Sequence, residues 1–103
     1  MYTNETTLIG FIRPPASLPR ILEFDGNKIQ CVETVIVTGQ NSALHIPIFI
    51  TGEAMQTARE WFEVLPEGFH ARTQSTVMML DGLPCLVVNF IQAREDKRWQ
   101  IFE

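Results

Sequence analysis

One helical segment among strand-like runs constrains the fold more than any other feature of this chain. Residues 53–64 contain no Gly or Pro and are rich in helix formers. Four apolar side chains recur at helical spacing on one face: Met55, Ala58, Phe62 and Leu65. The runs before and after this segment are rich in β-branched residues. The pattern predicts a mostly β protein with one helix.

Turn residues divide the rest of the chain into strands. We expect five: a first strand bent at Pro14, Pro15 and Pro19 that covers residues 7–13 and 20–24, and further strands at 29–38, 43–51, 69–80 and 83–92. Asp25-Gly26 and Asp81-Gly82 are strong hairpin signals. Gly10 within the first strand indicates a bulge or sharp bend, and Pro47 indicates an edge or bulge position.

The order of these elements, with the helix between the third and fourth strands, is that of an OB fold, a five-stranded Greek-key barrel. Closing the sheet into a barrel would remove exposed edges, whereas an open α+β sheet with one helix on it is the alternative. At 103 residues the chain has room for one domain with one core. We expect an OB-fold domain over residues 1–92 and a charged, aromatic tail over 93–103.

Composition excludes several classes of protein. With 46% hydrophobic and 19% charged residues, the chain is not intrinsically disordered. No apolar run approaches the roughly 18 residues of a membrane-spanning helix, and the N-terminus lacks the pattern of a signal peptide. Two cysteines are too few for a disulfide framework, so a cytoplasmic location is expected. The formal net charge of -4 argues against strong binding to DNA.

Catalytic and metal-binding patterns are absent from the sequence. His45 and His70 match no metal-ligand spacing, and Cys31 and Cys85 form no C-x-x-C motif. Both cysteines lie in apolar strands, where a thiol is usually a packing residue. We therefore expect a protein that is not an enzyme and that uses no cofactor and no metal.

Short motifs along most of the chain resemble one family. Asn4 is followed by the strand motif Leu8-Ile9-Gly10-Phe11-Ile12, an apolar run closes on a glycine at 48–52, and a helix exit reads Leu-Pro-Glu-Gly at 65–68. The next strand places Ala71, Thr73, Ser75 and Val77 at inward positions. In order and spacing, residues 4–92 resemble the bacterial single-stranded-DNA-binding proteins and their relative, primosomal replication protein N.

The resemblance implies an OB fold, a homodimer or homotetramer, and binding of single-stranded DNA in replication or repair. Three departures from the family weaken that expectation. His45 stands where the family often carries a tryptophan, Glu67 replaces a lysine, and the long basic loop between the last two strands is reduced to residues 78–83. Binding of single-stranded DNA or RNA is therefore expected to be weak and independent of base sequence.

An OB fold binds ligands across its second and third strands and the adjoining loops. The candidate nucleic-acid-binding residues are Arg13, Arg20, Lys28, His45, Phe49 and Arg72. The acidic residues Glu53, Glu60, Glu63 and Glu67 lie on the helix and its exit, away from that face. Phe49 alternates with Ile48 and Ile50, so it is equally consistent with core, oligomer interface or base-stacking platform. A lone histidine such as His45 is also consistent with an ordinary surface or capping residue.

Two further groups bear on partners. Ile9 and Phe11 alternate against Leu8, Gly10 and Ile12, so one set points out of the barrel, and we expect Ile9 and Phe11 in an oligomer interface. In the tail, Trp99, Ile101 and Phe102 are candidates for recruiting a protein partner, with docking on the chain's own barrel or on a symmetry mate as the alternative. These groups support a second hypothesis, an OB-fold assembly subunit that has lost DNA binding.

Overall fold

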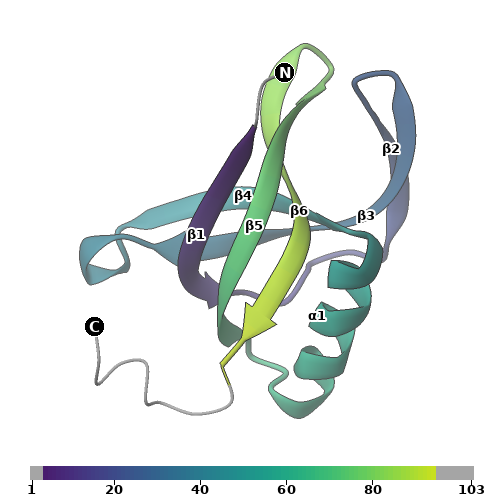
Figure 1. The fold of residues 1–103 in the computed structure, drawn as a ribbon. Coiled ribbons are helices and arrows are strands. Elements are labelled where there is room, and N and C mark those ends of the chain that lie inside the picture. The colour runs from purple at the N-terminus through teal and green to yellow at the C-terminus, as the bar shows by residue number, and fades with distance from the viewer. Residues whose placement is uncertain (1–3, 95–103) are drawn as a thin grey trace.

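The computed structural model describes residues 4–94 of the chain, which form a mostly β structure with one helix, as the sequence predicts (Figure 1). Its elements are β1 (Glu5–Ile12), β2 (Arg20–Phe24), β3 (Asn27–Thr38), a 3-10 turn (Gln40–Ser42), β4 (Leu44–Thr51), α1 (Gly52–Val64), β5 (Phe69–Leu80) and β6 (Leu83–Ala93).

The strands form one sheet in the order β1-β5-β6-β4-β3-β2, and β1 also pairs with β3. The sheet therefore closes on itself as a ring of β1, β5, β6, β4 and β3, while β2 extends from β3 as a hairpin. Two of the ladders in the ring are short. Two residue pairs join β1 to β3 and three join β4 to β6 in parallel, so the ring is an irregular closure rather than a uniform barrel.

The expected bent first strand is two separate strands, which corrects the predicted count from five to six. The prolines end β1 before residue 14, and β2 then pairs only with β3, whereas β1 pairs with β5 along its whole length. Two hydrogen bonds to the Arg13 backbone hold the start of the connector between β1 and β2. The Arg13 amide donates to the Val35 carbonyl at 3.0 Å, and the Thr34 hydroxyl donates to the Arg13 carbonyl at 2.5 Å. The other boundaries differ from the predictions by at most two residues.

Gly10 marks the point where β1 approaches β3. A Cβ atom at this position would overlap the Val37 carbonyl oxygen and lie 3.0 Å from Thr38 Cβ and 3.1 Å from Ile36 Cγ1. The Thr38 hydroxyl donates a hydrogen bond of 2.5 Å to the Ile9 carbonyl across the same contact. The glycine therefore permits close approach of two backbones, one of the reasons for a glycine within a strand.

The interior of the ring is filled by the side chains of every second residue along the strands, those that point inward. Ala71, Thr73 and Ser75 are completely buried, which confirms their predicted inward positions, while Val77 is half-buried. The buried members of this cluster are Ile12, Ile36, Ile48, Ile50, Ala54, Ala58, Phe69, Ala71, Val88 and Ile91. Small residues on β5 suit the narrow part of the ring beside Gly10, which lies opposite Ala71.

Helix α1 closes one end of this cluster with Ala54 and Ala58. The Phe69 ring packs between two helix aromatics, 6.0 Å from the centroid of Trp61 and 5.0 Å from that of Phe62. Trp61 is half-buried, as the sequence predicts. Leu65, predicted on the apolar face, is exposed because it lies beyond the last helical residue and has non-helical dihedral angles.

Pro47 lies in β4 opposite Val35, just before the three residues of β4 that pair with β6. At Pro47 the strand thus has a neighbour on one side, which agrees with the predicted edge position. In the described residues, no helix is both long enough and apolar enough to cross a membrane.

Gly10→Ala is expected to lower the free energy of unfolding by about 3 kcal/mol, the upper part of the range for overpacking, because the obstructing atom belongs to the backbone. Urea unfolding followed by far-UV circular dichroism measures the change. The control is Gly26→Ala, where φ is +80° but nothing lies within 4 Å of the new Cβ, and where a loss of about 1 kcal/mol is expected. Equal losses in the two variants would contradict this account of ring closure.

Candidate functional site

The predicted binding face, on β3 and β4, is covered by the chain's own hairpins. Phe49 points out of the ring, opposite in phase to Ile48 and Ile50 as predicted, yet it is only 6% exposed. Its ring packs edge-on against Phe24 with centroids 5.2 Å apart, and Cys31 and Val87 complete a second buried cluster. A base has no access to the Phe49 ring in this conformation, so the ring is a core side chain here.

Hydrogen bonds hold this cover in place. The Asp25 amide donates to the Met79 carbonyl at 3.0 Å, and the Met79 amide donates to Asp25 Oδ1 at 3.1 Å. They connect the turn of the β2–β3 hairpin to the β5–β6 hairpin, and both hairpins rise side by side above the ring in Figure 1. The turn predicted at Asp25-Gly26 thus closes the face that was expected to be open.

The predicted cations near this face have acidic neighbours. Arg20 forms an ion pair with Glu33 at 2.7 Å, and Lys28 lies directly opposite Glu23 in the β2–β3 register. Arg13 lines a shallow hollow whose walls also include Glu33 and Glu67. Nearby carboxylates oppose a phosphate at each of these positions, because like charges repel the ligand.

A second outward surface lies where β1 closes the ring. We call it the closure face and define it by the outward side chains of β1, β5 and β6: Ile9, Phe11, His70, Arg72, Phe90 and Gln92. The register places Ile9 opposite Arg72, and Arg72 opposite Gln92. Phe11 lies opposite both His70 and Val37, and Val37 lies opposite His45. The closure face therefore reaches round the ring to His45.

Arg72 occupies the middle of the closure face. It is half-buried, its Nε atom has no hydrogen-bond partner, and it makes no ion pair among the described residues. Of the outward positions on β1, β5 and β6 that the structure describes, only Glu5 is acidic, and it lies opposite Thr76 at the far end of the ladder. A half-buried guanidinium without a counter-charge is costly, and an anionic ligand relieves that cost.

Aromatic rings flank Arg72. Phe11 packs edge-on against His70 with centroids 5.2 Å apart, and Phe90 is 44% exposed. Gln74 lies opposite Phe90 and Gln92 opposite Arg72, so neutral amides neighbour both the cation and the exposed ring. The amide of Arg94 donates to the His70 carbonyl at 2.9 Å, which brings a second arginine to the margin of the face. A cation, exposed rings and amides together suit a ligand with both anionic and planar parts.

The structure brings together only some of the predicted residues. Arg72 lies in the middle of the closure face and His45 at its margin, linked through Phe11 and Val37, whereas Arg20, Lys28 and Phe49 belong to the other side of the ring. Ile9 and Phe11 point outward as expected, but they share the face with Arg72. Trp99, Ile101 and Phe102, with most of the predicted tail over 93–103, lie outside the described residues.

His70, Phe90 and Gln92 were missed by sequence reasoning. The predicted inward set on β5 already implied that His70 and Arg72 point outward, so strand alternation alone contained that signal. Phe90 depends on the bulge between Gln74 and Ser75, which shifts the register of β6 and has no clear sequence mark.

No group of three or more His, Cys, Asp or Glu in the described part of the chain is arranged to hold a metal ion. Comparisons with known proteins match the chain to no protein-family model and to no curated protein.

The two cysteines differ in environment. Cys31 is completely buried in the outer cluster, and burial raises the pKa of its thiol above the ordinary 9.0; Arg20 lowers it by a smaller amount and Glu33 raises it slightly. Cys85 is half-buried, and its Sγ lies 3.7 Å from the Leu83 carbonyl oxygen. Because only the thiolate is nucleophilic, Cys31 is an unreactive packing residue.

In the native protein at pH 8, iodoacetamide is expected to alkylate Cys85 much faster than Cys31, as mass spectrometry of the digested protein will report. The raised pKa also has a consequence for stability. The folded state holds the Cys31 proton more tightly than the unfolded state does. The contribution of the protonated thiol to the free energy of unfolding is therefore fully present below pH 9.0 and is lost as the pH rises through the folded-state pKa. Equal alkylation of the two thiols in folded protein would contradict the closed outer cluster.

Proposed function

We propose that the protein is an OB-fold protein that binds single-stranded nucleic acid, DNA in the first instance, weakly and without sequence preference, in replication or repair. The fold assignment is supported by the ring order β1-β5-β6-β4-β3, the parallel pairing of β4 with β6 and the helix between β4 and β5. The closed ring favours this assignment over an open sheet.

One observation carries the functional proposal: Arg72 lies half-buried, without a counter-charge among residues 4–94, on a face with exposed aromatic rings. A guanidinium binds phosphate oxygens through paired N–H donors, while a neighbouring base stacks on an exposed ring such as Phe90. Stacking and phosphate contacts hold any base, so the binding is sequence-nonspecific. The site is therefore assigned to the closure face rather than to the covered face of β3 and β4.

The arrangement also leads us to expect weak binding by a protein of net charge -4. Few cations lie on the closure face, and each phosphate contact on a single strand contributes about -0.7 to the slope of log K against log salt. Charges on the acidic helix exit are screened over about 10 Å at moderate salt, so they do not abolish a local contact.

Arg72→Gln is expected to weaken binding of a fluorescein-labelled oligo-dT about tenfold and to reduce the salt slope by about 0.7, because one charge-assisted phosphate contact is lost. Fluorescence anisotropy at low and moderate salt measures both quantities. Lys28→Gln is the matched control, since it removes the same charge from the opposite side of the ring beside Glu23.

An equal effect of the two substitutions would move the site away from the closure face. Absence of oligo-dT binding by the unsubstituted protein at low salt, where electrostatic attraction is strongest, would end the nucleic-acid proposal itself.

A second candidate function is that of an assembly subunit, and one specific observation favours it. Ile9 is 46% exposed and Phe90 is 44% exposed on the same face, and exposed apolar side chains that share a face are typical of protein interfaces. The same face cannot hold a nucleic acid at Arg72 and a protein partner at Ile9 at one time, because these two residues are directly paired.

The double variant Ile9→Ser with Phe90→Ser is expected to reduce the molar mass of any oligomer, since both apolar contacts are lost. Size-exclusion chromatography with light scattering provides the measurement, and Leu83→Ser, at the exposed first residue of β6, is the control. An oligomer that withstands the double substitution would place its interface elsewhere.

A further inference from the structure

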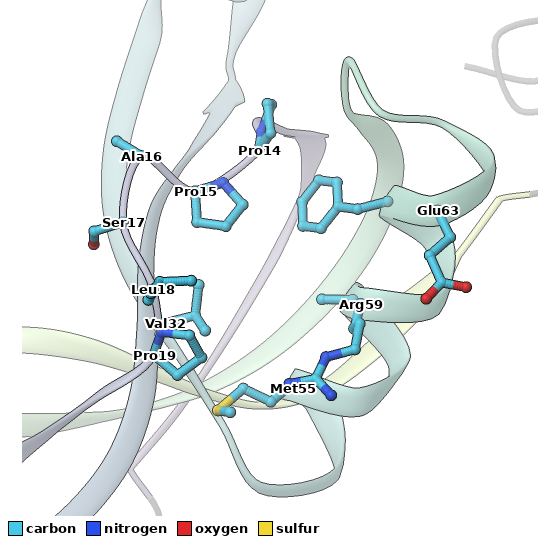
Figure 2. A pocket seen from close by; sticks show the side chains of 12 residues that line it. Pro14, Pro15, Ala16, Ser17, Leu18, Pro19, Val32, Met55, Arg59 and Glu63 are labelled. Carbon is cyan, nitrogen blue, oxygen red and sulfur yellow. The ribbon is translucent and has the colours of Figure 1, made fainter.

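An apolar hollow lies between the connector that follows β1 and helix α1. Its volume is about 600 Å³. In Figure 2 the prolines and Leu18 of the connector form one wall, and Met55 and Arg59 of α1 form the opposite wall. The Glu63 carboxylate points away from the hollow, so the interior is mostly apolar, with Arg59 as a charged side chain in its wall.

The hollow is a surface without a partner in the described residues. Leu18 lines it and is 85% exposed, and Ala58 and Phe62 also contribute to its floor. The connector is held at its start by hydrogen bonds to the Arg13 backbone, and its proline rings restrict the backbone dihedral angles beyond that point. Proline rings and a methionine thioether are good contacts for an aromatic side chain.

We propose that residues 95–103 of the same chain occupy this hollow, with Trp99 seated between the connector and α1. The segment carries the apolar side chains Trp99, Ile101 and Phe102, which suit an apolar hollow. Binding of Trp99 in the hollow would remove its indole from water, and the favourable free energy of this transfer grows with the apolar area that is buried.

The segment begins close enough to reach the hollow. The amide of Arg94 is bonded to the carbonyl of His70, the residue after Phe69. Phe69 packs on Phe62, which lines the hollow, and it also lies opposite Ile12, two residues before Pro14. The five residues from 95 to 99 span up to about 17 Å when extended. This length is sufficient for Trp99 to reach the Phe62 and Pro14 end of the hollow.

The cations next to Trp99 suit the same placement. Lys97 and Arg98 directly precede Trp99 and follow Glu95 and Asp96, so the two cations are the charges nearest the indole, and exposed carboxylates lie near the end of α1 at Glu60, Glu63 and Glu67. The carboxyl end of a helix attracts cations as well, because its unpaired carbonyls carry partial negative charge. A tail seated with Trp99 in the hollow brings its two cations to this acidic end.

The test uses the full chain with Trp61→Phe, which leaves Trp99 as the single tryptophan. Trp99 is expected to emit at the short wavelength of a buried indole and to be shielded from acrylamide quenching, independently of protein concentration. Adding Met55→Lys to this background places a charge in the hollow, and the emission is expected to shift to longer wavelength with severalfold stronger quenching.

Leu83→Ser in the same background is the matched control, since Leu83 is exposed and far from the hollow in sequence and sheet register, and no change is expected. Leu18→Ser is the milder hollow variant for use if Met55→Lys does not fold; it should raise quenching while circular dichroism stays native.

A solvent-exposed Trp99 in the Trp61→Phe protein would overturn the proposal. Shielding that disappears on dilution would also overturn it, because it indicates a tail from a second copy. Shielding unaffected by either hollow variant would also overturn it. None of these results depends on nucleic-acid binding.

Discussion

The approach of β1 to β3 at Gly10 is the contact on which the rest of the structure depends. At this point β1 is paired with β5 on one side and with β3 on the other, and only a residue without a side chain leaves room for the Val37 carbonyl. The hydroxyls of Thr34 and Thr38 bond across the same junction. Because just two residue pairs close the ring there, every interior contact depends on a short ladder and its side-chain bonds.

Closure also determines which surfaces remain available. Once β1 ends at the ring junction, the prolines carry the chain across to β2, and the β2–β3 hairpin then folds over the outer side of β3 and β4. Phe24 covers Phe49, and the Asp25 turn is bonded to Met79. The surface that is left exposed is the opposite one, around Ile9, Arg72 and Phe90. The same connector leaves the apolar hollow against α1.

The charged side chains also differ between the covered face and the exposed face of the ring. Cations on the side of the ring near β2 have carboxylates beside them, of which the Arg20–Glu33 pair is the clearest case. Both partners of that pair are substantially exposed, so it contributes at most about 1 kcal/mol to stability, but it does offset the charge of Arg20 toward a ligand. Arg72 has no such neighbour among the described residues. Within the described part of this acidic protein, the charges beside Arg72 therefore oppose an anion less than those beside Arg20 do.

The amino-acid pattern alone determined the elements of this protein. Period-two alternation and turn residues located the strands, and helical spacing located α1. Alternation on β5, with its phase taken from the resemblance to the single-stranded-DNA-binding proteins, predicted that Ala71, Thr73 and Ser75 point inward. These are local properties, since backbone geometry fixes which way each side chain points. Tertiary structure alone decided that the bent strand becomes β1 and β2, that a hairpin covers Phe49, and that Arg72 makes no ion pair with the residues that the structure describes. Those outcomes depend on contacts between residues far apart in the chain, such as Asp25 with Met79 and Ile9 with Arg72, and no local pattern encodes which of them form.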